Sequence, residues 1–344
     1  MWERAKSEMV AASVVAVAAV ALVGGAGAGG PAAGRPQQPQ GLMGSVLYAT
    51  PSCEVRRLSL ASLRSQAVTT DGGHCRFWPS PDGRLLAMHP GRPFIAPSRL
   101  QVLDLDTGRT VMPFRHPDLA VSPPAWGPRS DVLATCDGSQ PGGIVREWRA
   151  GHTSAVVHRA CFPGFVGGRL AYRLVPGGGR VAVGWHTVAD AGSLGKLLGE
   201  GVTQVPGIAA AGDVLAVPAT RTTTEPGSAT TVIVFFDAAG DTTGVWDTGR
   251  PAREIGLTGG GRIAWCRTAS GVIARAVAGG RTLGVGLHAV SAAASPDGAT
   301  TVFSTGGALV FVDTAGGGEL GRVPVRAGWL AWLQAGTATS SSGV

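Results

Sequence analysis

Residues 80–87 read SPDGRLLA, and residues 295–302 read SPDGATTV. Proline fixes φ at the first central position of a β-turn, and aspartate tolerates the second position while bonding nearby backbone. Glycine then takes a position that other residues enter poorly. The pattern predicts two tight turns between strands, formed by Ser80, Pro81, Asp82 and Gly83 and by Ser295, Pro296, Asp297 and Gly298.

A second kind of turn follows, in which an apolar strand ends in aspartate and the turn is closed by glycine. It is predicted at three places, with the residue pairs Asp104 and Gly108, Asp237 and Gly240, and Asp313 and Gly316. The distance from residue 80 to residue 295 accommodates five units of about 43 residues, a period typical of four-stranded propeller blades. Short apolar runs separated by glycine-rich turns fill most of residues 45–333, and they predict strands.

These observations predict an all-β chain, a β-propeller of four-stranded antiparallel blades. Seven blades fit best, although six or eight also fit. The inner strands are predicted near residues 74–79, 119–126, 161–166, 205–211, 254–258, 288–294 and 327–333. The last of these has no strands after it, and the strands near residues 45–50 and 54–60 have no inner strand before them. Pairing the C-terminal strand with the N-terminal strands would close the ring and remove a free sheet edge.

The Ser-Pro-Asp-Gly turn, the short apolar strand after it and the VLDLDTG-type turn resemble the WD40-like repeats of TolB-type β-propellers. The resemblance covers most of residues 45–333 and implies an envelope protein that binds other proteins. It transfers no site residue, because the shared motifs are turn residues. Fold similarity alone does not establish function.

The composition excludes two other classes of protein. The chain has 344 residues, of which 54 are glycine and 23 proline, and only 15% are charged while 44% are hydrophobic. A charged disordered chain would need low hydrophobicity and high net charge. A long coiled coil would be broken by this much glycine and proline.

The N-terminal residues predict export. A short polar segment with Arg4 and Lys6 precedes an apolar run and a glycine- and alanine-rich stretch. Residues 1–28 therefore form either a cleaved signal peptide or a single membrane anchor, and both alternatives fit the length. Residues 29–44 are predicted to be a linker, residues 45–334 the propeller, and residues 335–344 a disordered tail. The propeller is expected outside the cytoplasm, with membrane contact only through an uncleaved N-terminal segment.

Five cysteines occur, and none forms a CxxC pair. In an oxidising compartment, two disulfides and one thiol would fit this number. The predicted pairs are Cys53 with Cys75 and Cys136 with Cys161, because each pair closes a short loop. Five buried reduced thiols are the open alternative.

The predicted inner strands carry few polar side chains at the mouth of the central channel. The weak candidates are His74, Arg76, Glu254, His288 and Arg326. A hard divalent cation needs several carboxylates, and a catalytic zinc needs about three ligands with an orienting shell. We therefore predict no catalytic residue, metal or cofactor. Four of the nine tryptophans also lie near inner-strand ends, where they pack between blades or rim the channel: Trp78, Trp126, Trp329 and Trp332.

The formal net charge is +7, but the basic residues are spread singly along the chain. A nucleic-acid groove would interleave basic and aromatic residues, so no nucleic-acid partner is predicted. The leading hypothesis is an exported, non-catalytic propeller that binds an envelope or extracellular protein or another ligand. The alternative is a propeller hydrolase or lactonase-like enzyme with a site at the channel mouth. A weaker alternative is recognition of an anionic envelope polymer through scattered arginines.

Overall fold

The structure is a computed structural model, and it describes residues 42–90, 99–114, 122–137, 143–149, 151–158, 160–174, 182–186, 191–194, 207–222, 229–284 and 289–333. The predicted export segment, most of the linker and the tail at residues 335–344 lie outside these residues. In the described part, no helix has the length and hydrophobicity needed to cross a bilayer. Strands and one short 3-10 helix, η1 (Gly259–Gly261), provide the regular structure there, which confirms the predicted all-β class.

The described strands form seven four-stranded antiparallel sheets, within the predicted range of six to eight blades. The first contains β4 (Arg76–Pro79), β5 (Leu85–His89), β6 (Gln101–Asp104) and β7 (Thr110–Val111). The second contains β8 (Ala125–Trp126), β9 (Val132–Asp137), β10 (Ile144–Arg149) and β11 (His152–His158). The third contains β12 (Ala160–Val166), β13 (Arg169–Leu174), β14 (Ala182–His186) and β15 (Ala191–Leu194).

The remaining sheets follow the same plan, except for the one that holds both chain ends. The fourth contains β16 (Ala209–Ala211), β17 (Val214–Thr222), β18 (Ala229–Phe236) and β19 (Thr242–Asp247). The fifth contains β20 (Ala252–Thr258), β21 (Ile263–Thr268), β22 (Gly271–Ala276) and β23 (Leu283–Gly284). The sixth contains β24 (Ser291–Ala294), β25 (Thr300–Ser304), β26 (Leu309–Asp313) and β27 (Glu319–Val323).

The seventh sheet joins the two ends of the described chain. Its strand order is β28 (Leu330–Leu333), β1 (Ser45–Ala49), β2 (Val55–Ser59) and β3 (Ser65–Ala67). Ser45 pairs with Leu333 and Leu47 with Ala331, in antiparallel register. The predicted pairing of the C-terminal strand with the N-terminal strands is therefore confirmed, and the pairing leaves β1 with neighbours on both sides.

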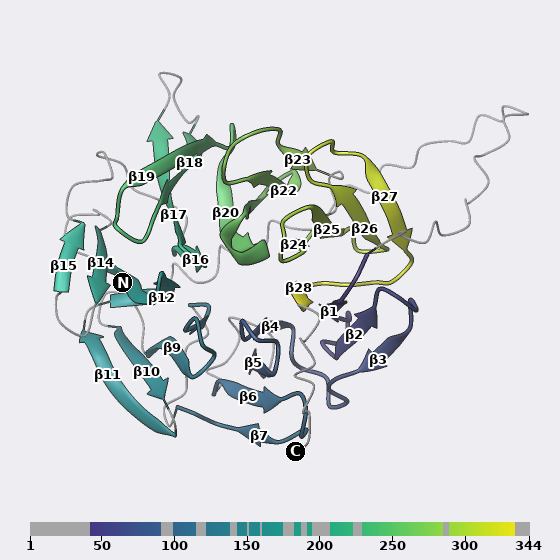
Figure 1. Cartoon of the computed structure of the whole chain (residues 1–344), viewed down its shortest axis with the longest axis horizontal. Coiled ribbons are helices and arrows are strands. Elements are labelled where there is room, and N and C mark those ends of the chain that lie inside the picture. The colour runs from purple at the N-terminus through teal and green to yellow at the C-terminus, as the bar shows by residue number, and fades with distance from the viewer. Residues whose placement is uncertain are drawn as a thin grey trace, which may run out of the picture. The chain divides into compact units, whose positions relative to one another are not determined.

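One strand of each sheet lies at the centre of the ring (Figure 1). These inner strands are β4, β8, β12, β16, β20, β24 and β28, and each overlaps a predicted inner strand. β8 and β16 are shorter than predicted, at two and three residues. The fold class is thus a β-propeller ring of four-stranded blades, as the turn motifs predict.

The inner strands run through the ring in the same direction. At their first residues, the Leu330 amide donates to the Ser291 hydroxyl at 3.2 Å, which joins β28 to β24. Beyond their last residues, the Asp82 amide donates to Ser130 at 3.2 Å, and the Gly167 amide donates to the Gly212 carbonyl at 3.0 Å. We call the side where the inner strands begin the start face and the side where they end the turn face.

The core lies between neighbouring sheets. Between the seventh and first sheets, Leu47 and Leu333 form one buried cluster with Phe77 and Leu86. The inner strands keep small residues where sheets approach closely, and a Cβ on Gly164 of β12 would come within 2.6 Å of the Ala210 Cβ on β16. Large side chains on the second and third strands and small residues on the inner strands thus allow tight packing between sheets.

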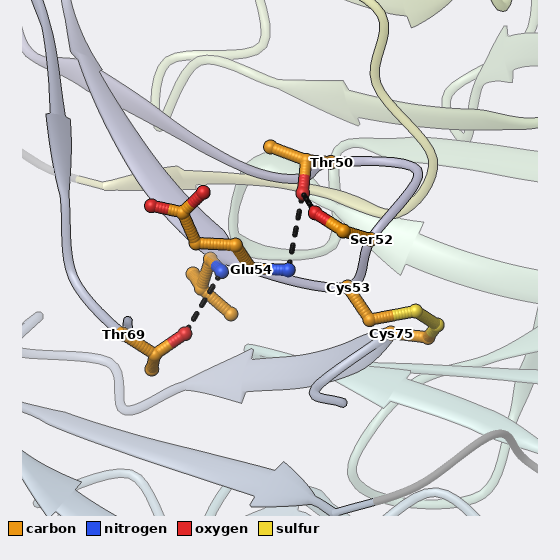
Figure 2. The surroundings of a disulfide bond; sticks show 7 residues. Thr50, Ser52, Cys53, Glu54, Thr69 and Cys75 are labelled. Atoms are coloured by element: carbon orange, nitrogen blue, oxygen red, sulfur yellow. Dashed lines mark hydrogen bonds between the residues drawn. A yellow bond between two sulfur atoms is a disulfide. The ribbon is translucent and has the colours of Figure 1, made fainter. Parts of the chain in front are cut away.

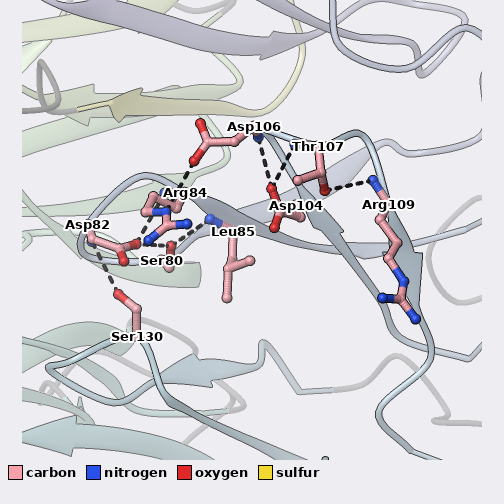
Figure 3. Close-up of polar contacts among 9 residues, drawn as sticks. All are labelled: Ser80, Asp82, Arg84, Leu85, Asp104, Asp106, Thr107, Arg109 and Ser130. Atoms are coloured by element: carbon pink, nitrogen blue, oxygen red, sulfur yellow. Dashed lines mark hydrogen bonds and ion pairs between the residues drawn. The ribbon is translucent and has the colours of Figure 1, made fainter. Parts of the chain in front are cut away.

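Both Ser-Pro-Asp-Gly segments form the predicted turns (Figure 3 shows the first). The Gly83 amide donates to the Ser80 carbonyl at 2.9 Å, and Gly83 has φ +72°. The Ser80 hydroxyl donates to the Asp82 carboxylate at 2.6 Å and accepts from the Leu85 amide at 2.9 Å. The motif is therefore a structural unit in which the serine hydroxyl joins the turn to the next strand.

The second SPDG turn repeats these contacts. Gly298 has φ +74°, and the Ser295 hydroxyl donates to Asp297 at 2.5 Å and accepts from the Thr300 amide at 3.0 Å. The Ser295 hydroxyl, together with the Ala299 amide, lowers the pKa of Asp297 below its ordinary value. The hydrogen-bonding capacity of this carboxylate is directed into its own turn.

The aspartate turns are also confirmed, with one correction. The Asp104 carboxylate accepts from the amides of Asp106 and Thr107, and Gly108 has φ +72°. The Asp237 turn likewise closes on Gly240 at φ +94°. In the third turn Gly316 was predicted to close the turn, but the left-handed residue is Gly317, at φ +71°, whose amide donates to the Asp313 carbonyl at 2.8 Å. The turn needs the glycine four residues after the aspartate, as at Gly108.

The two predicted disulfides are present, and each joins neighbouring sheets. Cys53 lies between β1 and β2 of the seventh sheet and bonds to Cys75, which directly precedes β4 of the first (Figure 2). Cys136 on β9 of the second sheet bonds to Cys161 on β12 of the third. The bonds therefore link blades to one another and supplement non-covalent packing between them.

Replacing Gly298 with alanine tests the turn geometry. A left-handed φ is strained for alanine, and the new Cβ would lie 3.0 Å from the Arg262 Cβ. We expect Gly298→Ala to lower the free energy of unfolding by about 1–2 kcal/mol, measured by urea denaturation. Gly307→Ala is the control, because Gly307 is not left-handed and has open space around its Cβ position. Equal stability of the two variants would contradict this account of the turn.

Candidate functional site

The inner strands enclose a central cavity of about 920 Å³. This volume is within the usual range for small-molecule sites. Its walls are mostly alanine, glycine, proline and tryptophan from all seven inner strands or the turns after them. The charged side chains among its described lining residues are Asp213, Glu254 and Arg262.

Five tryptophans line the cavity. Trp78, Trp126, Trp329 and Trp332 are the ones predicted near inner-strand ends, and Trp265 joins them from β21. The ring centroid of Trp329 lies 6.0 Å from that of Trp78 and 5.9 Å from that of Trp265. Three indoles from three sheets therefore form one aromatic cluster.

Backbone hydrogen bonds hold two of these indoles in place. The Trp329 Nε1 donates to the Phe77 carbonyl at 2.8 Å, and the Trp126 Nε1 donates to the Trp78 carbonyl at 2.9 Å. Each bond crosses from one sheet to its neighbour. The polar atoms of these rings are thus satisfied by the protein, and their apolar surfaces remain available to the cavity.

Trp265 reaches the cavity because its partner on the inner strand is glycine. Gly256 of β20 pairs with Trp265 of β21, and a Cβ on Gly256 would lie 2.4 Å from the indole. The ring therefore lies across the inner strand. Trp265 was not among the predicted residues, because it lies on a second strand. Its signal is a glycine opposite a tryptophan, and that pairing is visible only once the strand register is known.

A compact ion-pair group lies beside the aromatic cluster. Arg76 and Arg267 donate to different oxygens of Glu254, at 3.2 and 2.9 Å. The side chains of Arg76 and Glu254 are only 16% and 14% exposed. The Arg76 guanidinium also stacks over the Trp329 ring, 5.1 Å from its centroid. Burial lowers the pKa of Arg76, and the Glu254 carboxylate opposes this effect.

The Arg76–Glu254 pair spans the ring. Arg76 begins β4 and Glu254 lies near the start of β20, and these strands are not neighbours. The inner strands β24 and β28 lie between them on one side, and β8, β12 and β16 on the other (Figure 1). The pair is therefore a contact across the channel at the start face.

His89 on β5 completes the surroundings of this group. It is buried, and its ring packs edge-on against Trp78 with centroids 5.6 Å apart. Burial and the nearby Arg76 guanidinium lower the pKa of His89 to about 4. The imidazole is therefore neutral at pH 7.

Of the five sequence candidates, the structure brings together two, Arg76 and Glu254. His74 is buried and its Nε2 contacts the Asp71 carboxylate at 3.2 Å, outside the cavity lining. Arg326 is exposed just before β28. His288 lies outside the described residues. Arg267 and His89 were not predicted, because they lie on β21 and β5, the second strands of their sheets.

Two observations on the described residues concern metal binding and nucleophilic chemistry. Among them, no three His, Cys, Asp or Glu side chains converge in an arrangement that would hold a metal ion. Cys266 is a buried free thiol, and burial raises its pKa to about 12. A thiol with this pKa is almost entirely protonated at neutral pH and is a poor nucleophile.

Comparisons with solved structures identify the fold. The structure of TolB from Acinetobacter baumannii matches with a TM-score of 0.49 and 11% identity, over 84% of this chain and 66% of that one. A prolyl endopeptidase matches with a TM-score of 0.52 and 14% identity, over 81% and 47% of the two chains. Oligogalacturonate lyase in complex with manganese matches with a TM-score of 0.51 and 11% identity, over 79% and 82%.

This chain spans less than two thirds of the length of the TolB and prolyl endopeptidase chains. No protein-family model matches the sequence, and no curated protein matches it. The seven four-stranded sheets bear out the β-propeller predicted from the repeats, and structures of TolB proteins are among the matches. Because their identities are low and the set includes enzymes as well as TolB, they show the fold alone.

Gly256→Ala tests the position of Trp265. The added Cβ would overlap the indole, so the ring must leave its place over β20. We expect a loss of about 1–3 kcal/mol in the free energy of unfolding and a changed near-UV circular dichroism spectrum of the tryptophan cluster. Gly244→Ala on β19 is the control, since its Cβ would lie 3.5 Å from the Phe235 ring, an ordinary van der Waals contact. An unchanged spectrum for Gly256→Ala would mean that Trp265 does not cross the inner strand.

Proposed function

We propose that this protein is an exported, non-catalytic β-propeller that acts as a binding platform, with the tryptophan-lined cavity as its ligand site. The observation that carries the proposal is the composition of the cavity. Aromatic surface is concentrated there, and the carboxylate of Glu254 is engaged by two guanidinium groups. Cavities with mostly apolar walls and a few fixed polar groups are typical of ligand sites.

The geometry favours binding over turnover. Glu254, the acidic group beside the aromatic cluster, is held in ion pairs, and a general acid or base must exchange a proton with its substrate. His89 packs edge-on against Trp78 and is buried. These residues hold one another in fixed positions, which suits a preformed binding site.

Export is supported by two features. The two disulfides are typical of proteins that fold in an oxidising compartment. The TolB-like fold is compatible with an extracytoplasmic location. We therefore expect a partner or ligand from the cell envelope or the extracellular medium.

Filling the cavity tests this function. Ala125 lines the cavity on β8, and Ala125→Phe would reduce its volume. We expect small molecules from an envelope extract to raise the thermal midpoint of the natural protein but not that of the variant. Ala155→Phe, on the exposed strand β11, is the control and should respond like the natural protein. An Ala125→Phe variant that is stabilised to the same degree would contradict binding in the cavity.

The hydrolase alternative is tested with the same proteins. Chromogenic esters and lactones are incubated with the natural protein and with Ala125→Phe. We expect no turnover above background from either. Turnover by the natural protein that disappears in Ala125→Phe would establish the enzyme and overturn the non-catalytic proposal.

A further inference from the structure

We propose that the ligand of the cavity is a neutral saccharide, namely a chain of pyranose rings with equatorial substituents, such as β-1,4-linked glucose or N-acetylglucosamine. This inference rests on the proposed function and names the class of ligand for its site. Three features of the cavity carry it: flat aromatic surfaces, unpaired strand edges and a locally neutralised carboxylate.

The tryptophan cluster provides flat apolar surfaces from several directions. The Trp329 ring centroid lies 6.0 Å from that of Trp78 and 5.9 Å from that of Trp265, and all three indoles line the cavity. Trp265 is only 5% exposed, so the half-buried Trp78 and Trp329 provide most of the accessible aromatic surface. A pyranose ring with equatorial hydroxyls exposes axial C–H bonds on both faces, so each face is a flat apolar patch. Such a face packs on an indole and removes apolar surface from water on both partners.

The walls supply many hydrogen-bonding groups without charge. Each inner strand is an edge strand of its sheet, so one side of its backbone has no partner strand within the sheet and faces the channel. Some groups of these edges already have partners from neighbouring sheets, among them the Phe77 and Trp78 carbonyls and the Leu330 and Ala294 amides. The N–H and C=O groups of an edge that lack such partners need others when water is displaced. A ligand with many hydroxyls can donate to and accept from such edges, whereas a purely apolar ligand would leave them unsatisfied.

The charges beside the aromatic cluster disfavour ionic ligands of either sign. Glu254 carries a negative charge at the cavity surface, which disfavours a carboxylate or phosphate next to it. Arg76 and Arg267 are not among the lining residues, but they lie within 3.2 Å of that same carboxylate and already compensate its charge, so it offers little attraction to an ammonium ion. Arg76 also already occupies the cation site over the Trp329 ring. A neutral hydroxyl or amide N–H donating to the remaining lone pairs of Glu254 fits both constraints.

The experiment is a titration of the full chain with chitopentaose and with cellopentaose, followed by isothermal calorimetry and by intrinsic tryptophan fluorescence. We expect saturable binding of at least one of them with a fluorescence change. Glu254→Gln should weaken this binding at least tenfold, because a charge-assisted hydrogen bond becomes a neutral one.

Glu147→Gln is the matched control. Glu147 is 16% exposed and its carboxylate lies 4.0 Å from Arg149 on β10, away from the cavity lining. It should bind the saccharide like the natural protein. Ala125→Phe, the variant with the smaller cavity, serves as a second variant in case Glu254→Gln does not fold, and it should also lose binding.

The outcomes separate the two proposals. Tighter binding of a glucuronate oligomer or of choline than of the neutral oligosaccharides would overturn the saccharide inference. The saccharide inference also fails if neither neutral oligosaccharide binds. If an envelope extract still stabilises the natural protein but not Ala125→Phe, the proposed function nevertheless stands. If no ligand of any kind depends on the cavity, both proposals fail.

Discussion

The antiparallel pairing of β28 with β1 is the constraint on which the rest of the structure depends. It joins residues from the two ends of the described chain in one sheet and leaves β28 as the inner strand of that sheet. Trp329, directly before β28, then donates to the Phe77 carbonyl and contacts Trp78 and Trp265. Without this pairing the aromatic cluster would lose its central member, and the Arg76 guanidinium would lose the ring over which it stacks.

The ion pair between Arg76 and Glu254 fixes side chains of two inner strands at the start face, but forming it costs desolvation free energy. Desolvating two charges is expensive, and a buried ion pair is weak evidence for stability. What the pair provides is a specific arrangement of side chains. It joins two non-neighbouring inner strands and holds the Arg76 guanidinium between the Glu254 carboxylate and the Trp329 ring. Under the proposed function, this arrangement would hold the carboxylate in a fixed position for a ligand.

Much of the fold was predictable because its signals are local. A Ser-Pro-Asp-Gly turn depends on a left-handed glycine and on bonds between residues within five positions of each other, as at Ser80 and Leu85. Both disulfides followed from short loop closure. The closing sheet followed from counting strands, since the last inner strand had no successors. Gly316 was predicted in place of Gly317 because residues 316–318 are all glycine, and the sequence alone does not show which of them takes the left-handed position.

The site was predictable only in part, because it depends on register between strands and on contacts across the ring. Arg76 and Glu254 were candidates from their positions at inner-strand starts, but nothing in the sequence pairs residues so far apart. Trp265, Arg267 and His89 lie on second strands and approach the site past the inner strands. For Trp265 this is possible because Gly256 has no side chain.

The most direct measurement of the central claim is the thermal unfolding of two truncated chains. One lacks residues 327–344, and so lacks Trp329 and β28; the other lacks only residues 335–344. The account predicts that the longer truncation loses cooperative unfolding or melts at a much lower temperature, whereas the shorter one melts like the natural protein. An unchanged, cooperative transition without residues 327–344 would contradict the claim that the pairing of the chain ends holds the structure together.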